Sequence, residues 1–213
     1  MPSIDDGARN KEESIKMLKD SFADGVSLCV ATPHCVVHRE EDILSFLIKR
    51  ENAFKTIEEE INSCGFPKVI LGAEVFLDND ISRYEGIEKL CIEGSSAMLI
   101  ELNVGKFSKQ IGEWIYSLTM KKITPIIAHI ERYPYAIQLI DELSDMAVYY
   151  QINASSLLSL SKRWHIKRLL KTGKTFFVSS DMHNTTSRPP LMKEANRAAV
   201  KKFKNDKLII YKK

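Results

Sequence analysis

The sequence TPIIAHIER at residues 124–132 begins with a short apolar run and leads directly to His129 and Arg132. A β-branched run of this length, apolar on both alternating faces, is typical of a parallel strand that helices cover. Similar runs recur along the chain and alternate with longer amphipathic segments, which is the pattern of βα units around a parallel sheet. We expect strands at 26–32, 68–73, 97–102, 124–128, 148–153 and 175–180.

The segments between these runs carry helical periodicity. In the first, Ile15, Leu18 and Phe22 fall on one stripe, Asn10 is suited to cap the helix, and Gly25 is suited to end it. Periodicity alone does not separate a barrel from an open doubly wound sheet. Further helices are expected at about 40–64 and near 108–120, 134–145, 164–172 and 190–203.

Size and composition are those of one globular domain. The 213 residues are 44% hydrophobic and 28% charged, which is enough for a single core, and we expect one domain over 1–213. The net charge of +3 gives no case for nucleic-acid binding. The sequence shows neither a signal peptide nor an apolar stretch long enough to enter a membrane.

The cysteines have the spacing of neither a metal site nor a disulfide framework. We therefore expect reduced thiols in a cytoplasmic protein. The four cysteines are Cys29, Cys35, Cys64 and Cys91.

Side chains that can bind metals or donate hydrogen bonds follow nearly every expected strand. Active sites of α/β barrels lie at the carboxyl ends of the strands, so these side chains should meet at one rim. Carboxylates and imidazoles together suit Mn²⁺, Fe²⁺ or Zn²⁺, and metals there can lower the pKa of a bound water to about 7 and supply hydroxide. The residues are His34, Glu74, Glu101, His129, Asn153, Asp181 and His183.

Two arginines accompany this set. Arg132 follows His129 closely, and Arg188 follows His183, and a guanidinium group matches phosphate oxygens and stabilises charge as a P–O bond breaks. Arg132 can instead pair with Glu131 or with Glu101. No cysteine opens a CxxxxxR phosphate loop, and neither a GxxxxGK[ST] loop nor a GxSxG elbow is present. The residues therefore favour metal-dependent phosphoester hydrolysis.

A series of motifs in this order resembles one family. It is the bacterial metal-dependent protein tyrosine phosphatases of the polymerase and histidinol phosphatase (PHP) superfamily, enzymes linked to capsule and exopolysaccharide synthesis. The resemblance runs from Ile4 to about Ala198, and its specific parts are IAHIERY and SDMHN with RPP. The motifs are IDDGA (4–8), ATPH (31–34), GAE (72–74), IEL (100–102), IAHIERY (127–133), SSDMHN (179–184) and SRPP (187–190).

The resemblance implies a distorted (β/α)7 TIM-like barrel, the PHP fold, with up to three divalent metals, manganese first and iron or zinc as alternatives. It implies phosphotyrosine on a bacterial tyrosine autokinase as substrate, and Arg132 and Arg188 as phosphate-binding residues. Residues matching the family's ligands are Asp6, His34 and His183 for one metal, Glu74, Glu101 and His129 for a second, and Asp181 with Glu74 for the remaining one.

The chain departs from the family at its start. The family begins with a short strand ending in HxH, and by the family spacing this pair would fall just upstream of Met1. We therefore expect the barrel to lack its first strand and two metal sites to keep their matched ligands. Two other readings stay open: a PHP phosphatase for a small molecule such as histidinol phosphate, and a remnant that binds phosphate or a kinase tail without hydrolysis. The oligomeric state is open as well.

Overall fold

The computed structural model describes residues 1–63, 65–105, 107–203 and 207–209, and its strands are all paired in parallel. One sheet has the order β2-β4-β5-β6-β7-β8-β9, and β1 pairs separately with β3. The expected α/β class with a parallel sheet is confirmed. The strands are β1 Leu28–Ala31, β2 His34–Val36, β3 Lys68–Leu71, β4 Glu74–Phe76, β5 Ala97–Glu101, β6 Thr124–Ile127, β7 Tyr149–Asn153, β8 Phe176–Ser179 and β9 Leu208–Ile209.

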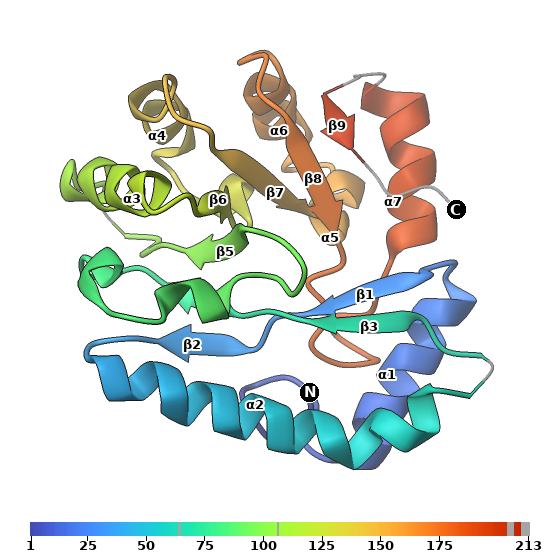
Figure 1. Cartoon of the computed structure of the whole chain (residues 1–213). Helices are drawn as coiled ribbons and strands as arrows, with labels where there is room; N and C mark the ends of the chain where they lie inside the picture. The colour runs from blue at the N-terminus through green and yellow to red at the C-terminus, as the bar shows by residue number, and fades with distance from the viewer. Residues whose placement is uncertain (64, 106, 204–206, 210–213) are drawn as a thin grey trace.

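The helices lie outside the strands, as Figure 1 shows. Helices α1 and α2 pack against each other through Leu18, Ile57 and Ile61, and cover the β1–β3 pair. The other helices accompany β5 to β8. The helices are α1 Lys11–Ala23, α2 Glu40–Ile61, α3 Gln110–Met120, α4 Ala136–Glu142, α5 Ala154–Leu158, α6 Arg163–Leu170 and α7 Met192–Ala198, which continues as a π-helical turn over Ala199–Phe203.

The first helix begins and ends as expected. The Asn10 side chain accepts a hydrogen bond from the Glu13 N–H at 2.9 Å, which caps α1. Gly25, just past its end, has a φ of 92°, a conformation that glycine adopts without strain. Every longer helix that the periodicity predicts is present, within a few residues of its expected limits. The short helix α5 is not predicted because five residues carry too little periodicity.

Two strands are interrupted side by side. Residues 32–33 separate β1 from β2, and residues 72–73 separate β3 from β4. Hydrogen bonding continues across both interruptions, since the Gly72 N–H donates to the Ala31 carbonyl at 2.9 Å and the Glu74 N–H to the Pro33 carbonyl at 3.0 Å. A Cβ on Gly72 would lie 3.2 Å from the Thr32 methyl group, so a larger residue at this position would require Thr32 to shift by a few tenths of an ångström. Because this pairing continues, β2 and β4 keep the parallel alignment that β1 and β3 begin.

The strands do not form a closed barrel among the described residues, because β2 and β9 are the two edges of the long sheet. The strand expectations at 26–32 and 68–73 correspond to β1 and β3, while β2 and β4 are additional three-residue strands. Runs of three residues are too short for a period to be detected.

Other features bear on the sequence expectations. Cys29, Cys35 and Cys91 are free thiols, and Cys64 lies outside the described residues. Within the described part of the chain, no helix combines the length and the apolar character that spanning a membrane requires.

Candidate metal centre

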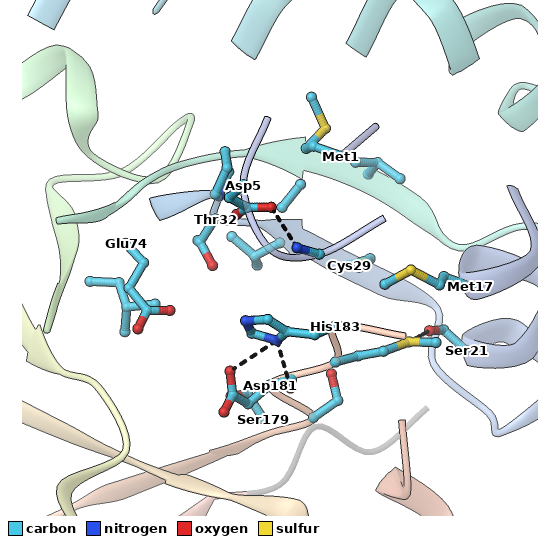
Figure 2. Close-up of a pocket in the computed structure, with 18 of the residues that line it drawn as sticks. Met1, Asp5, Met17, Ser21, Cys29, Thr32, Glu74, Ser179, Asp181 and His183 are labelled. Carbon is cyan, nitrogen blue, oxygen red and sulfur yellow. Dashed lines mark hydrogen bonds and ion pairs between the residues drawn. The ribbon is translucent and has the colours of Figure 1, made fainter. Parts of the chain in front are cut away.

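The predicted ligands come from different strands, and the sheet register brings the first of them together. His34 begins β2 and Glu74 begins β4, and the two residues are directly paired. Glu101 ends β5, and His129 follows β6. Figure 2 shows the carboxylates of Glu74 and Asp181 and the ring of His183 facing one hollow.

Asp6 joins two histidines into a first group. Its Oδ1 lies 3.4 Å from His34 Nε2 and 3.4 Å from His183 Nε2. One ligand atom from each of the three residues lies within 4.8 Å of the others. An imidazole pair with one carboxylate is a donor set that suits a divalent transition metal.

His34 also belongs to a second group, with Glu74 and Glu101, whose ligand atoms lie within 4.8 Å of one another. His129 Nε2 lies 3.1 Å from Glu74 Oε1 and 3.2 Å from Glu101 Oε1. The His129 side chain is 2% exposed, so the charges it faces are shielded little by water.

These contacts decide the protonation of His129. Burial lowers its pKa, but the hydrogen bonds to Glu101 and Glu74 outweigh burial and raise the pKa to about 9. The same hydrogen bond from His129 lowers the pKa of Glu101. Two carboxylates and an imidazole thus hold a proton in a buried position, and this is an environment that also suits a cation.

Asp181 contacts both arginines. Its Oδ2 accepts from Arg132 Nη2 and from Arg188 Nη2, each at 2.6 Å, and from Asn153 Nδ2 at 2.5 Å. The direct partner of Arg132 is therefore Asp181, and the alternative that it pairs with Glu131 or Glu101 is wrong. The side chains of Arg132 and Arg188 are 34% and 33% exposed, so both arginines are partly accessible to solvent.

The backbone is strained where the site is built. His129 has a φ of 31° and Asp181 a φ of 50°, values that cost free energy in residues other than glycine. Gln151 holds the first of these positions, because its Oε1 accepts a hydrogen bond from the His129 N–H. Gln151 Nε2 donates to Asn153 Oδ1 at 2.8 Å and to Ser179 Oγ at 2.7 Å. A buried chain of side chains therefore connects His129 with Asp181.

Two residues of this site, Gln151 and Asp5, are not among those that the sequence predicts. Gln151 is buried in the middle of β7, and the only signal was one polar residue within an apolar run. Asp5 orients the backbone at His34, since its Oδ2 accepts from the His34 N–H at 3.1 Å and its Oδ1 from the Gly7 N–H at 3.0 Å. The sequence signal for Asp5 is the pair of acids in IDDGA, of which only Asp6 is a predicted ligand.

The donors fit a divalent metal. They are oxygens and imidazole nitrogens from separate elements, and the strands and the hydrogen bonds of Asp5 and Gln151 fix the backbone that carries them. Manganese, iron and zinc all accept such a set. Asn153 lies within the site and hydrogen-bonds to Asp181, as expected.

Comparisons with known proteins point to one group. A family model described as capsular polysaccharide synthesis, CpsB/CapC, matches residues 1–210. The tyrosine-protein phosphatase CpsB of Streptococcus pneumoniae is 32% identical over 218 residues, covering 94% of this chain and 86% of that protein. The tyrosine-protein phosphatase CpsB of Streptococcus agalactiae is 30% identical with the same coverage.

A more distant relative and a solved structure belong to the same group of phosphatases by their names. The tyrosine-protein phosphatase YwqE of Bacillus subtilis is 25% identical, covering 95% of this chain and 82% of that protein. A solved structure from work on YwqE of Bacillus subtilis and CpsB of Streptococcus pneumoniae, described there as unique metal-dependent tyrosine phosphatases, matches with a TM-score of 0.78. It is 22% identical and covers 97% of this chain and 85% of that one, and it shows a shared fold.

Proposed function

We infer that this chain, which belongs to the CpsB/CapC family of capsular polysaccharide synthesis, is a metal-dependent tyrosine-protein phosphatase. It is thus a hydrolase that acts on phosphoric monoesters, and its relatives are named tyrosine-protein phosphatases. The observation that supports this most directly is the convergence of two groups of acid and imidazole ligands, sharing His34, beside two arginines that meet at Asp181.

We propose a role for each group. Asp6, His34 and His183 hold one divalent cation, Glu74, Glu101 and His129 hold a second, and Asp181 contributes with Glu74 to a further position. Manganese is the proposed metal, with iron or zinc as alternatives. Bound cations of this kind supply activation of water at neutral pH and neutralisation of phosphoryl charge.

The arginines bind the phosphoryl group in this proposal. Arg132 and Arg188 each donate from Nη2 to Asp181. Among the described residues their other guanidinium N–H groups have no acceptor, and in this proposal they donate to phosphoryl oxygens. Because Asp181 accepts from both, it keeps the two guanidinium groups close together without a phosphate. Asn153 adds a third donor to the same carboxylate oxygen and so fixes its position.

The finer features of the fold belong to the same proposal. We propose that the sheet is a distorted barrel from which the first strand is missing in these residues. A cavity of about 400 Å³ supports this, because side chains of β1, β3 and β8, including Cys29, Val69 and Phe177, line it from several sides. Such a space next to strand edges is what an absent strand would leave.

The proposed substrate is phosphotyrosine on a bacterial tyrosine kinase that controls capsule or exopolysaccharide synthesis, and the proposed place of action is the cytoplasm. Support comes from the family's description and from the names of the relatives.

A substrate and metal experiment tests the proposal. The purified protein is assayed with Mn²⁺ on a phosphotyrosyl peptide and on histidinol phosphate, before and after chelation with EDTA, and its metal content is measured by elemental analysis. We expect Mn²⁺-dependent turnover of the peptide only. Preference for histidinol phosphate would instead identify a small-molecule phosphatase, and bound metal or phosphate without turnover would identify a binding remnant.

Two histidines four residues apart give a matched pair of variants. His34 belongs to both ligand groups, whereas His38 pairs with Asp78 at 2.9 Å on the exposed surface. We expect His34→Ala to lower both metal content and turnover, and His38→Ala to leave both unchanged. Equal effects of the two substitutions would contradict the assignment.

A further inference from the structure

Apolar side chains lie next to the candidate ligands His34, Glu74 and Glu101 on the same face of the sheet. His34 pairs with Glu74, and two residues further along the strands Val36 pairs with Phe76, which in turn pairs with Glu101. Residues two apart in a strand point to the same face. Val36 and Phe76 therefore lie on the face of His34 and Glu74, one step nearer the carboxyl ends of their strands.

These two side chains line an open hollow together with ligand residues. Its apolar wall consists of Ile4, Val36 and Phe76, and its polar wall includes Asp6, His34 and Glu101. Val36 is 49% exposed, and Ile4 and Phe76 are partly exposed. An exposed apolar group that borders charged residues in one hollow is a feature that ligands use.

We propose that Ile4, Val36 and Phe76 form the subsite for the aromatic ring of an aryl phosphate. This inference rests on the proposed function, because it takes the adjoining ligands as the place where the phosphoryl group binds. One ester oxygen joins the ring of phosphotyrosine to its phosphorus, so the ring must contact whatever lies next to the phosphoryl site. On the side of Glu101 and His34 that contact is Phe76 and Val36.

The chemistry of the wall selects an aryl ester over an alkyl ester. The ring of Phe76 can meet a substrate ring edge to face, and Val36 and Ile4 can cover apolar area that water otherwise contacts. A phosphoseryl side chain offers one methylene in place of a ring and gains little from the same wall. The three residues come from β2, β4 and the segment before α1, so they approach the ring from different elements.

Two phosphonates that differ only by a ring test the subsite by binding. Benzylphosphonate and methylphosphonate are titrated calorimetrically into the Mn²⁺-loaded protein, into Phe76→Ala, into Val36→Ala and into the control Leu44→Ala. Leu44 is an exposed apolar residue of α2 that does not line the hollow. The wild-type protein should prefer benzylphosphonate by about tenfold, the scale of discrimination that an apolar pocket achieves.

We expect the ratio of benzylphosphonate affinity to methylphosphonate affinity to fall toward one in Phe76→Ala and to fall partly in Val36→Ala. The affinity for methylphosphonate itself should not change. Leu44→Ala should keep the wild-type preference. Should Phe76→Ala fail to fold, Phe76→Leu replaces it and should lower the preference by a smaller factor. An unchanged preference in both the Phe76 and Val36 variants, or no preference in the wild-type protein, would overturn the subsite.

Activity is measured separately, so the two inferences fail in different ways. If the ring preference depends on Phe76 but phosphotyrosyl peptide is not hydrolysed, the subsite stands and the proposed function fails. If the peptide is hydrolysed and no variant alters the preference, the proposed function stands and the subsite fails.

Discussion

Replacing Arg132 with alanine separates catalysis from stability at this site. Arg132 Nη2 donates to Asp181 Oδ2 at 2.6 Å, and its side chain is one-third exposed. Asp181 keeps two other donors after the substitution, Arg188 and Asn153, so its carboxylate is not left unpaired. A partly exposed ion pair of this kind contributes at most about 1 kcal/mol to folding.

The effect on the reaction should be much larger. Removing one donor that stabilises developing charge typically lowers kcat by about 10²–10³, which is about 2.7–4 kcal/mol in the transition state. For a chain of this size, about 1 kcal/mol of stability corresponds to a change in Tm of roughly 2–4 °C. We therefore expect a large loss of rate with a small change in melting temperature.

The assay is turnover of p-nitrophenyl phosphate with Mn²⁺, together with thermal melting and elemental analysis of each variant. Arg83→Ala is the control, because Arg83 is exposed, contacts Tyr84 and is not among the residues that line the hollows next to the candidate ligands. A kcat within threefold of the wild-type value would refute the role of Arg132 in phosphate binding. A large fall in Tm or in metal content would show that Arg132 acts on the fold or on the ligands instead.

Three further predictions concern a residue that supports the site, a helix cap and a buried thiol. Gln151→Leu removes the buried acceptor of the His129 N–H and the two hydrogen bonds that Gln151 donates. The free energy of unfolding in urea should therefore fall by about 1–3 kcal/mol, and an unchanged value would contradict the described network. Asn10→Ala should cost about 1 kcal/mol in the same measurement with unchanged kcat, because it removes only the cap of α1. Burial raises the pKa of the Cys35 thiol to about 12, which favours the neutral form at pH 8. Iodoacetamide should therefore label Cys35 only after the protein is unfolded in urea, and rapid labelling of the native protein would contradict this.

The longer strands and the helices could be predicted from sequence because their patterns extend over several residues. The run at 97–102 and the helix after Asn10 are examples in which period and capping residue agree. The ends of β1 and β3 were less predictable, since the chain continues into β2 and β4 with the same partners and only a local break.

The grouping of the acids and histidines could be predicted from sequence better than the residues that support them. Acids and histidines at strand ends are conspicuous by type and place, and the structure brings His34, Glu74 and Glu101 within reach of one another. Gln151 and Asp5 act through backbone N–H groups of His129 and His34, contacts that depend on tertiary geometry. The pairing of both arginines with one carboxylate oxygen could not be read from their spacing for the same reason.

The interruption between β1 and β2 and the one between β3 and β4 have equal length. The register is therefore the same on both sides, with Ala31 paired to Leu71 before the interruptions and His34 paired to Glu74 after them. Deleting a single residue from either interruption would slip one strand past the other and turn Glu74 or His34 to the opposite face. Only insertions or deletions matched in both strands would preserve the alignment. This part of the chain is thus constrained in length as much as in residue type.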